Sequence, residues 1–124
     1  MDLISTDRAP AAIGPYAQAV CAGPYVFTSG QIPLRPDGTF VDGSIDDQVQ
    51  QVLANLDAIL LAAGLTRRDV VKATIFLTDL VNFERVNQAY AAYFGDHRPA
   101  RSTVQVAALP RGAMVEIEFT ALRG

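Results

Sequence analysis

The stretch from Ser44 to Gly64, SIDDQVQQVLANLDAILLAAG, decides the class of fold. Its apolar residues recur at helical spacing, at Val49, Val52, Leu53, Leu56, Ile59, Leu60 and Ala63. Ser44 with Asp47 is an acidic variant of the capping box, and Gly64 suits the left-handed residue that follows a last turn. The stretch therefore predicts a helix with one apolar stripe, which must pack against a second layer.

Short strands and one more helix are predicted around it. Alternating or β-branched runs predict strands at Ala17–Cys21, Tyr25–Ser29, Val70–Leu77, Ser102–Val106 and Val115–Ala121. Turns are predicted at Gly23-Pro24 and Pro36-Asp37-Gly38. A second helix is predicted from about Asn82 to Phe94, with Phe83, Val86, Tyr90 and Phe94 on one stripe.

The predicted order is two strands, an optional third strand, a helix, a strand, a helix and two strands. Both helices have one apolar stripe, so a sheet can receive both on one face. The sequence thus predicts one α+β domain over residues 1–124, a sandwich with two helices on one side of the sheet. The other sheet face would be uncovered within one chain.

The composition is apolar for a chain without a membrane span. Hydrophobic residues make up 50% and charged residues 19%, below the roughly 25% usual for soluble domains. No run of eighteen apolar residues occurs, so we expect the excess to be buried at a subunit interface. Cys21 is the only cysteine and the N-terminus does not resemble a signal peptide, which favours the cytosol.

The charge distribution argues against general nucleic-acid binding. The net charge is -3, and nine of the ten basic residues are arginines spread along the sequence. The longest basic run is the pair Arg67-Arg68, whereas nucleic acids need a clustered cationic face. A local patch formed by folding stays open.

Arg101 is the first candidate for chemistry. It lies in the stretch Arg98–Val106, where an extended segment follows a proline-broken loop, and it shares a strand side with Thr103 and Gln105. A guanidinium held by a strand can grip a small carboxylate through two parallel hydrogen bonds. The pattern taken alone favours a simpler interpretation, an arginine that makes a surface ion pair.

Glu116 and Glu118 are the candidate proton carriers. They alternate with Val115, Ile117 and Phe119, which places both carboxylates on one strand face about 7 Å apart. Burial of one would raise its pKa and let it carry a proton at neutral pH. A solvated strand face is the alternative.

Four further residues are candidates for lining a pocket. Asn87 is in register with the apolar stripe of the second helix, Tyr16 follows the rigid turn Ile13-Gly14-Pro15, and Ser29-Gly30 ends a strand. Each also fits a structural role: a loop hydrogen bond for Asn87, packing for Tyr16 and a bulge at Ser29-Gly30. His97 is the only histidine, which disfavours a Ser-His-Asp triad and a multi-histidine metal site. Phosphate-loop and dinucleotide motifs do not occur.

Four segments together resemble the reactive intermediate deaminase family, also called the YjgF or Rid family. They are Ala11–Ala19, Thr28–Pro33, Val86–Tyr90, and Pro99–Ser102 continued through Leu109-Pro110 to Val115–Glu118. The resemblance implies a chorismate-mutase-like homotrimer with a ligand cleft at each subunit interface. It also implies hydrolysis of enamines and imines such as 2-aminoacrylate to 2-oxo acids and ammonia, without a metal or an organic cofactor.

The resemblance also implies roles for the candidates. Arg101 would clamp the substrate carboxylate, and Glu116 would position water or pass a proton to the departing amine. Tyr16, Ser29, Gly30 and Asn87 would shape the pocket, from one subunit or two. Uncatalysed hydrolysis is already fast in this family's chemistry, so orientation and proton transfer suffice.

The chain departs from the family pattern at Thr103. Many members have cysteine there; a threonine hydroxyl can still donate to a ligand, whereas oxidant sensing through that position is not expected. The loop Gly95–Arg98 is also shorter than in some members. Two other functions stay open: a non-catalytic module that binds small carboxylates or unfolded chains, and, less favoured, RNA cleavage or translation inhibition.

Overall fold

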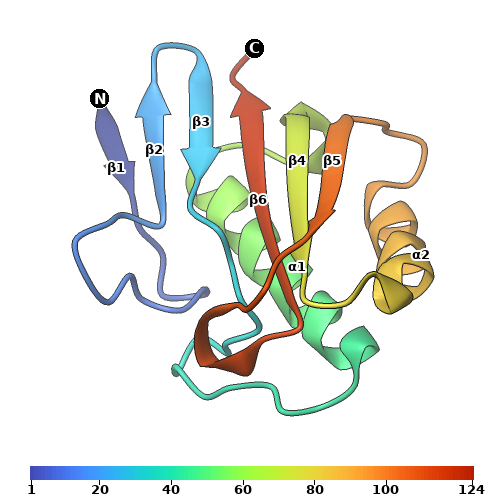
Figure 1. The fold of residues 1–124 in the computed structure, drawn as a ribbon. Helices are drawn as coiled ribbons and strands as arrows, with labels where there is room; N and C mark the ends of the chain where they lie inside the picture. Colours follow the sequence, from blue (N-terminus) through green and yellow to red (C-terminus); the bar gives the residue numbers. More distant parts are fainter.

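A six-stranded sheet carries two helices on one of its faces in the computed structural model, which describes residues 1–124 (Figure 1). The elements are β1 (Asp2–Ile4), β2 (Ala19–Ala22), β3 (Tyr25–Thr28), α1 (Ile45–Ala62), β4 (Val70–Leu77), α2 (Phe83–Phe94), β5 (Ala100–Gln105) and β6 (Val115–Leu122). The strands lie in the order β1-β2-β3-β6-β4-β5. Only β4 and β5 pair in parallel, so the sheet is mixed and the predicted α+β class is confirmed.

The elements agree with the predicted ones except near the N-terminus. The third early strand is β1, which pairs with β2, and not a strand between β3 and α1. Residues 29–44 form only isolated bridges, Gln31 with Ile117 and Leu34 with Phe40. β5 begins two residues before its predicted start because Lys72 of β4 already pairs with Ala100.

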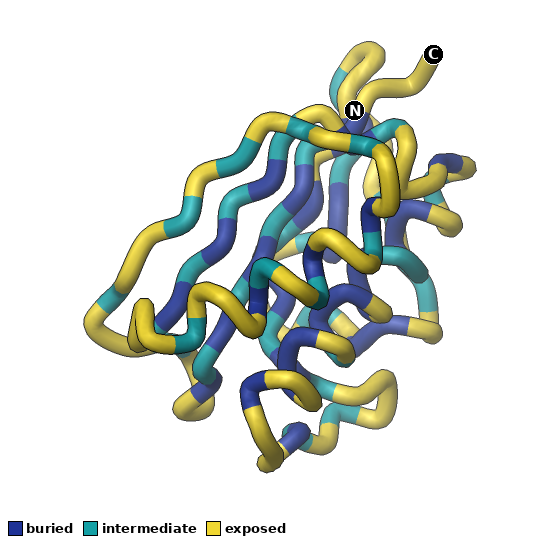
Figure 2. The backbone as a smooth tube through the Cα atoms, turned by 90° about the vertical axis from the view of Figure 1, so that its right-hand side faces the viewer, coloured by how far each residue is buried: buried dark blue, intermediate teal, exposed yellow.

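Helix α1 forms the centre of the core. It packs across β6 and against α2, and its apolar stripe is buried from Val49 to Leu60 (Figure 2). The stripe meets the buried side of β6, which consists of Val115, Ile117, Phe119 and Ala121. The layer predicted from residues 44–64 is therefore present, and it leaves the second face of the sheet free.

The N-terminus of α1 is capped as the sequence predicts. The Ser44 hydroxyl accepts from the Asp47 backbone N–H at 3.2 Å, and Asp47 Oδ2 accepts from the Ser44 N–H at 3.3 Å. Replacing Ser44 with alanine is expected to lower the free energy of unfolding by about 1 kcal/mol, because the first turn loses one of its acceptors. Urea unfolding measures this; the exposed Ser5→Ala is the control, and equal midpoints for both variants would contradict the assignment.

The uncovered sheet face is partly apolar. Tyr25, Phe27, Val104 and Leu122 point away from the helices and are each about two-fifths exposed, at 43%, 42%, 43% and 39%. Glu116 and Glu118 lie on the same face, because they alternate with buried residues of β6. This face is the open side of the sheet seen in Figure 1. Neither helix has the length and apolar character needed to cross a bilayer.

Candidate functional site

Arg101 lies on the edge strand β5 and points toward α2. It pairs with Ala73 of β4, and directly paired residues share a sheet face, so its side chain lies on the side that carries the helices. Its Nη1 donates to Asn87 Oδ1 at 2.6 Å. Its Cζ lies 5.0 Å from the centre of the Tyr90 ring and 5.6 Å from that of Phe83.

The three residues that contact Arg101 lie close together because of the helical repeat of α2. Phe83, Asn87 and Tyr90 are four and three residues apart, so they lie on one face of α2, above the edge strand. The two ring faces and the amide oxygen therefore hold one guanidinium from three directions. A cation held in this way keeps its orientation without a carboxylate partner.

The charge of Arg101 is not neutralised within the chain. The two ion pairs of the structure join Arg68 to Asp96 at 3.0 Å and Arg85 to Asp46 at 2.7 Å. The partners of Arg101 are a neutral amide and two aromatic rings. The surface ion pair that the sequence pattern favoured is thus absent, and the guanidinium retains donors for an anion.

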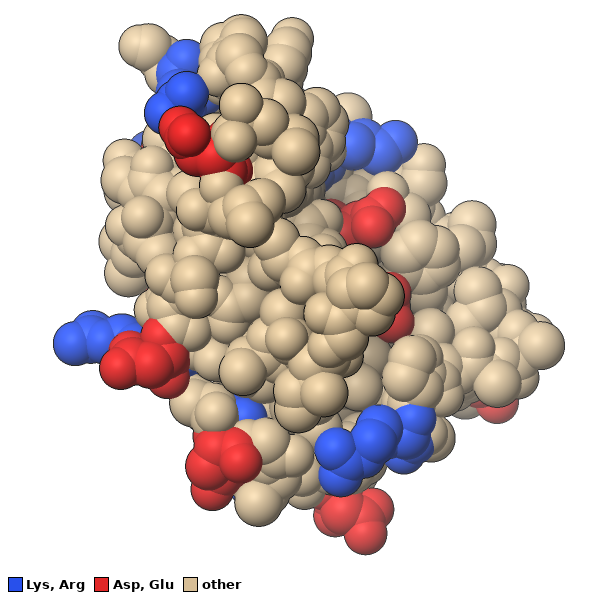
Figure 3. All heavy atoms as spheres, turned by 90° about the vertical axis from the view of Figure 1, so that its left-hand side faces the viewer, with Lys and Arg blue, Asp and Glu red and all other residues tan.

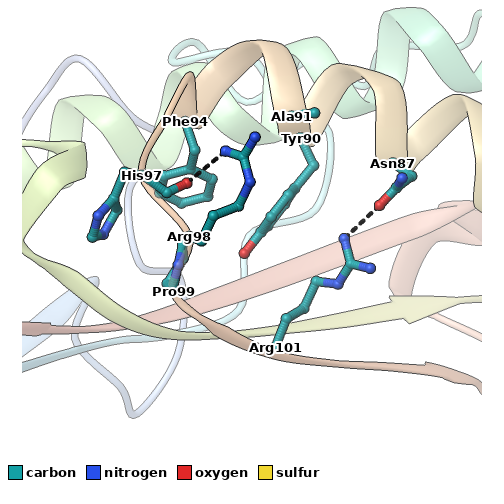
Figure 4. A pocket seen from close by; sticks show the side chains of 8 residues that line it. All are labelled: Asn87, Tyr90, Ala91, Phe94, His97, Arg98, Pro99 and Arg101. Atoms are coloured by element: carbon teal, nitrogen blue, oxygen red, sulfur yellow. Dashed lines mark hydrogen bonds between the residues drawn. The ribbon is translucent and has the colours of Figure 1, made fainter.

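A pocket of about 500 Å³ opens beside Arg101 (Figure 4). Its walls come from α2 and from the loop that enters β5, namely Asn87, Tyr90, Ala91, Phe94, His97, Arg98, Pro99 and Arg101. No acidic side chain lines it. The His97 Nε2 is 2.7 Å from the Val70 carbonyl, so this ring nitrogen is already engaged.

Two hydroxyls on this side of the sheet are buried without a partner: Tyr90 Oη and Thr103 Oγ1. Thr103 pairs with Ile75 and faces the same side as Arg101, but it does not line the pocket. Burial raises the pKa of Tyr90 above its ordinary value, and the nearby charge of Arg101 opposes this rise. The phenol therefore stays protonated at neutral pH and keeps a hydrogen to donate.

Glu116 lies in a second, smaller pocket of about 260 Å³, together with Tyr16, Gly30 and Pro110. A Cβ on Gly30 would be 2.2 Å from Glu116 Oε2, so only glycine lets the carboxylate sit against this backbone. Burial raises the pKa of Glu116 above its ordinary value of 4.5, and the negative charge of Glu118 raises it further. Glu116 therefore keeps its proton to a higher pH than a solvent-exposed glutamate does.

Tyr16 lines this second pocket, whereas Ser29 precedes Gly30 in the chain without lining it. The Ser29 hydroxyl donates to the Ala17 carbonyl at 2.6 Å, and the Ser29 N–H donates to the Gln18 carbonyl at 2.9 Å. Tyr16 is 54% exposed although it lines the pocket. Ser29 thus fixes the strand end beside Gly30, and Tyr16 offers a free ring and hydroxyl.

The structure does not bring Arg101 and Glu116 together within one chain. Glu116 pairs with Phe76 on the open sheet face, whereas Arg101 faces the helices, and β4 separates their strands. The candidates therefore divide into two half-sites. The Arg half-site is Arg101 with Asn87, and the Glu half-site is Glu116 with Tyr16, Ser29 and Gly30.

The raised pKa of Glu116 predicts a pH dependence of stability. The folded-state pKa lies above the unfolded one, so folding takes up a proton between the two values and the free energy of unfolding falls as pH rises through that window. Glu116→Gln cannot ionise and is expected to lose this fall. Urea midpoints from pH 4 to 8 measure it, with Glu84→Gln on an exposed site of α2 as the control. Parallel curves for Glu116→Gln and wild type would contradict the prediction.

Tyr90, His97 and Arg98 line the pocket beside Arg101, although the sequence predicts no pocket role for them. Tyr90 was identified only as part of an apolar stripe, and its shared register with Asn87 was the available signal. Arg98 and His97 precede Pro99 in a loop, where sequence gives no orientation. No group of three His, Cys, Asp or Glu side chains lies close enough to hold a metal ion.

Comparison with known proteins places the chain in a family. The model of the family described as Endoribonuclease L-PSP matches residues 6–123. The chain is 49% identical over 123 residues to the 2-iminobutanoate/2-iminopropanoate deaminase of Mus musculus, covering 98% of this chain and 91% of that protein. It is 47% identical over 124 residues to the reactive intermediate deaminase TdcF of Escherichia coli, covering 98% and 96%.

The fold also matches solved structures of related proteins. The crystal structure of E. coli TdcF with bound serine superposes with a TM-score of 0.95 at 46% identity, covering 100% of both chains. Identity at this level over the whole length supports more than a shared fold. The chain belongs to the YjgF/Rid family, whose family model is described as Endoribonuclease L-PSP, and the resemblance found in its sequence is confirmed.

Proposed function

We propose that this protein hydrolyses reactive 2-imino acids and their enamine tautomers to 2-oxo acids and ammonia. Water adds to the imine carbon, the nitrogen leaves as ammonia, and the carbonyl oxygen of the product comes from water. The observation that carries the proposal is the Arg101 guanidinium, which is fixed by Asn87 at 2.6 Å and has no carboxylate partner. Relatives that are named for this activity support it.

The half-sites divide the work of the reaction. Arg101 binds the substrate carboxylate with two parallel hydrogen bonds, and Asn87 orients the guanidinium. Glu116, whose pKa is raised, carries a proton between the attacking water and the departing nitrogen. Tyr16 and Gly30 shape the wall around that carboxyl, and Ser29 holds the strand end beside Gly30 through its hydrogen bond to the Ala17 carbonyl. Thr103 adds a free hydroxyl on the Arg101 side of the sheet.

The two half-sites meet between neighbouring subunits of a homotrimer with a chorismate-mutase-like arrangement. Two features support this assembly. Arg101 stands at the sheet edge, where a neighbour can approach it, and the open face offers Tyr25, Phe27, Val104 and Leu122 for burial. The reaction then needs only residues of this chain, without a metal or an organic cofactor.

Solution mass tests the assembly. Light scattering on the eluted protein is expected to give about three times the 13.3 kDa chain mass. The double variant Phe27→Glu, Val104→Glu places two charges on the apolar part of the open face and is expected to elute as a monomer with reduced activity. A wild-type monomer, or full activity in the monomeric variant, would contradict the trimeric site.

A direct assay tests the activity. The imine is generated by a dehydratase acting on serine or threonine, and release of 2-oxo acid and ammonia is followed with and without this protein. Acceleration is expected with wild-type protein, and equal rates would remove the proposal. Calorimetry then tests the alternative of a non-catalytic carboxylate-binding module, which would bind a 2-oxo acid without changing the rate.

RNA cleavage gains no support from the visible surface. Basic side chains occur singly or in pairs beside acidic ones on the side drawn in Figure 3, and they form no continuous cationic face. A weak RNA affinity at low salt would be the first sign against this conclusion, and a filter-binding titration measures it.

A further inference from the structure

The pocket beside Arg101 contains a second guanidinium, that of Arg98. Arg98 is exposed and donates from Nη1 to two carbonyl oxygens of its own loop, those of Gly95 and His97, the latter at 3.0 Å. Backbone carbonyls are neutral acceptors, and the nearby Asp96 is paired with Arg68. Within one chain, the pocket therefore holds two cations with no anion to compensate either of them.

A tyrosine hydroxyl, that of Tyr90, lies in the wall between the two guanidiniums. The Tyr90 ring lies between Arg98 and Arg101 in Figure 4. Tyr90 is only 7% exposed, and its hydroxyl is buried in this wall without an acceptor. A buried donor without a partner is a site that a ligand oxygen or an ordered water can satisfy. The two guanidiniums and this hydroxyl are all hydrogen-bond donors, so the pocket favours a ligand with several oxygen acceptors.

The pocket is also larger than a three-carbon acid requires. Its volume of about 500 Å³ falls in the range of roughly 300–1,000 Å³ in which proteins enclose drug-sized ligands. An imino acid held at Arg101 by its first carboxylate has room to extend past the Tyr90 ring toward Arg98. The end of such a side chain would meet a permanent positive charge.

We propose that Arg98 is a specificity-determining residue and that the preferred substrates are imino acids with a second, distal carboxylate. The first carboxylate binds Arg101, and the second binds the Arg98 guanidinium at the pocket mouth. The inference rests on the proposed function, because it concerns the substrate class of that same site. The hydrolysis itself is unchanged, since the distal carboxylate takes no part in bond making or breaking.

A matched pair of five-carbon imines tests this proposal. The side chain of the glutamate imine ends in a carboxylate, whereas that of the norvaline imine ends in a methyl group. Amino acid oxidases generate both imines in the assay. The measured quantity is the ratio of kcat/KM for the glutamate imine to that for the norvaline imine. In wild type this ratio is expected to exceed one and to fall as salt screens the Arg98 charge.

Variants of Arg98 make the test specific. Arg98→Ala and Arg98→Met are expected to lower the ratio about tenfold, the size of one exposed charge-assisted hydrogen bond. Arg98→Lys restores the charge and is expected to recover part of the ratio. Arg8→Ala removes the same charge from an exposed residue outside this pocket and is expected to leave the ratio at its wild-type value.

Two outcomes would overturn the inference. The first is a ratio within twofold of wild type in both Arg98→Ala and Arg98→Met. The second is binding of 2-oxoglutarate no tighter than 2-oxopentanoate in calorimetry on wild type, an experiment that needs no turnover. Failure of the proposed function has a different signature: neither imine would then be hydrolysed faster than in buffer, while the binding comparison would still decide the role of Arg98.

Discussion

Replacing Arg101 with alanine is expected to bring the rate of imino acid hydrolysis at low substrate concentration close to the rate measured without protein. The variant loses two charge-assisted hydrogen bonds to the substrate carboxylate, each worth about 1.5–3 kcal/mol. Together they correspond to a loss of about 10² to 10⁴ in kcat/KM. The measurement is 2-oxo acid release at several substrate concentrations, with the loss appearing mainly as a higher KM.

Two controls separate this effect from loss of the fold. Arg8→Ala removes an equal charge elsewhere and is expected to keep wild-type rates. Arg101→Lys keeps the charge but cannot offer two parallel donors, so it is expected to recover only part of the activity. Thermal unfolding of Arg101→Ala should stay close to wild type, because the lost contacts are one hydrogen bond and two ring contacts. Wild-type kcat/KM in Arg101→Ala would refute the assigned role.

Replacing Glu116 with glutamine is expected to lower kcat by about 100-fold or more, the usual contribution of a positioned acid or base. Glutamine keeps the size of the side chain, so its fit against Gly30 persists. The binding of the substrate carboxylate by Arg101 is also unchanged. The expected signature is therefore a lower kcat with little change in KM, opposite to that of Arg101→Ala. Single-turnover and steady-state rates measure the two parameters separately.

Glu118→Gln is the matched control for that variant. Glu118 lies on the same face of β6 but outside the pocket that contains Glu116 and Gly30. Its replacement removes a negative charge that raises the pKa of Glu116, so the pH profile of the rate is expected to shift to lower pH. An equal loss of kcat in both variants would count against a specific role for Glu116.

Much of the fold could be predicted because its elements are strongly patterned. Val70–Leu77 was predicted with its observed bounds, since a run of β-branched and apolar residues forms a central strand. The start of α1 could be predicted from Ser44 and Asp47, because a capping box depends only on two residues that are three positions apart. The strand Asp2–Ile4 could not be predicted, because it has three residues and is held by backbone pairing with β2.

The sequence named candidate residues for the site but could not predict how they are arranged. Arg101 and Asn87 were both candidates, and they contact each other because β5 runs beneath α2. Their separation from Glu116 depends on the register between β4, β5 and β6, which decides the sheet face of each side chain. The register between these strands cannot be predicted from the residues of any one strand. The role of Arg98 as a pocket wall depends on a loop conformation for the same reason.

Subunit complementation tests the shared site most directly. Arg101→Ala and Glu116→Gln proteins, each with little activity of its own at low substrate concentration, are unfolded, mixed in equal amounts and refolded together. If every site takes Arg101 from one subunit and Glu116 from its neighbour, each mixed trimer contains one intact site, and about a quarter of wild-type activity is expected. A refolded mixture no more active than either variant alone would contradict a site built from two subunits.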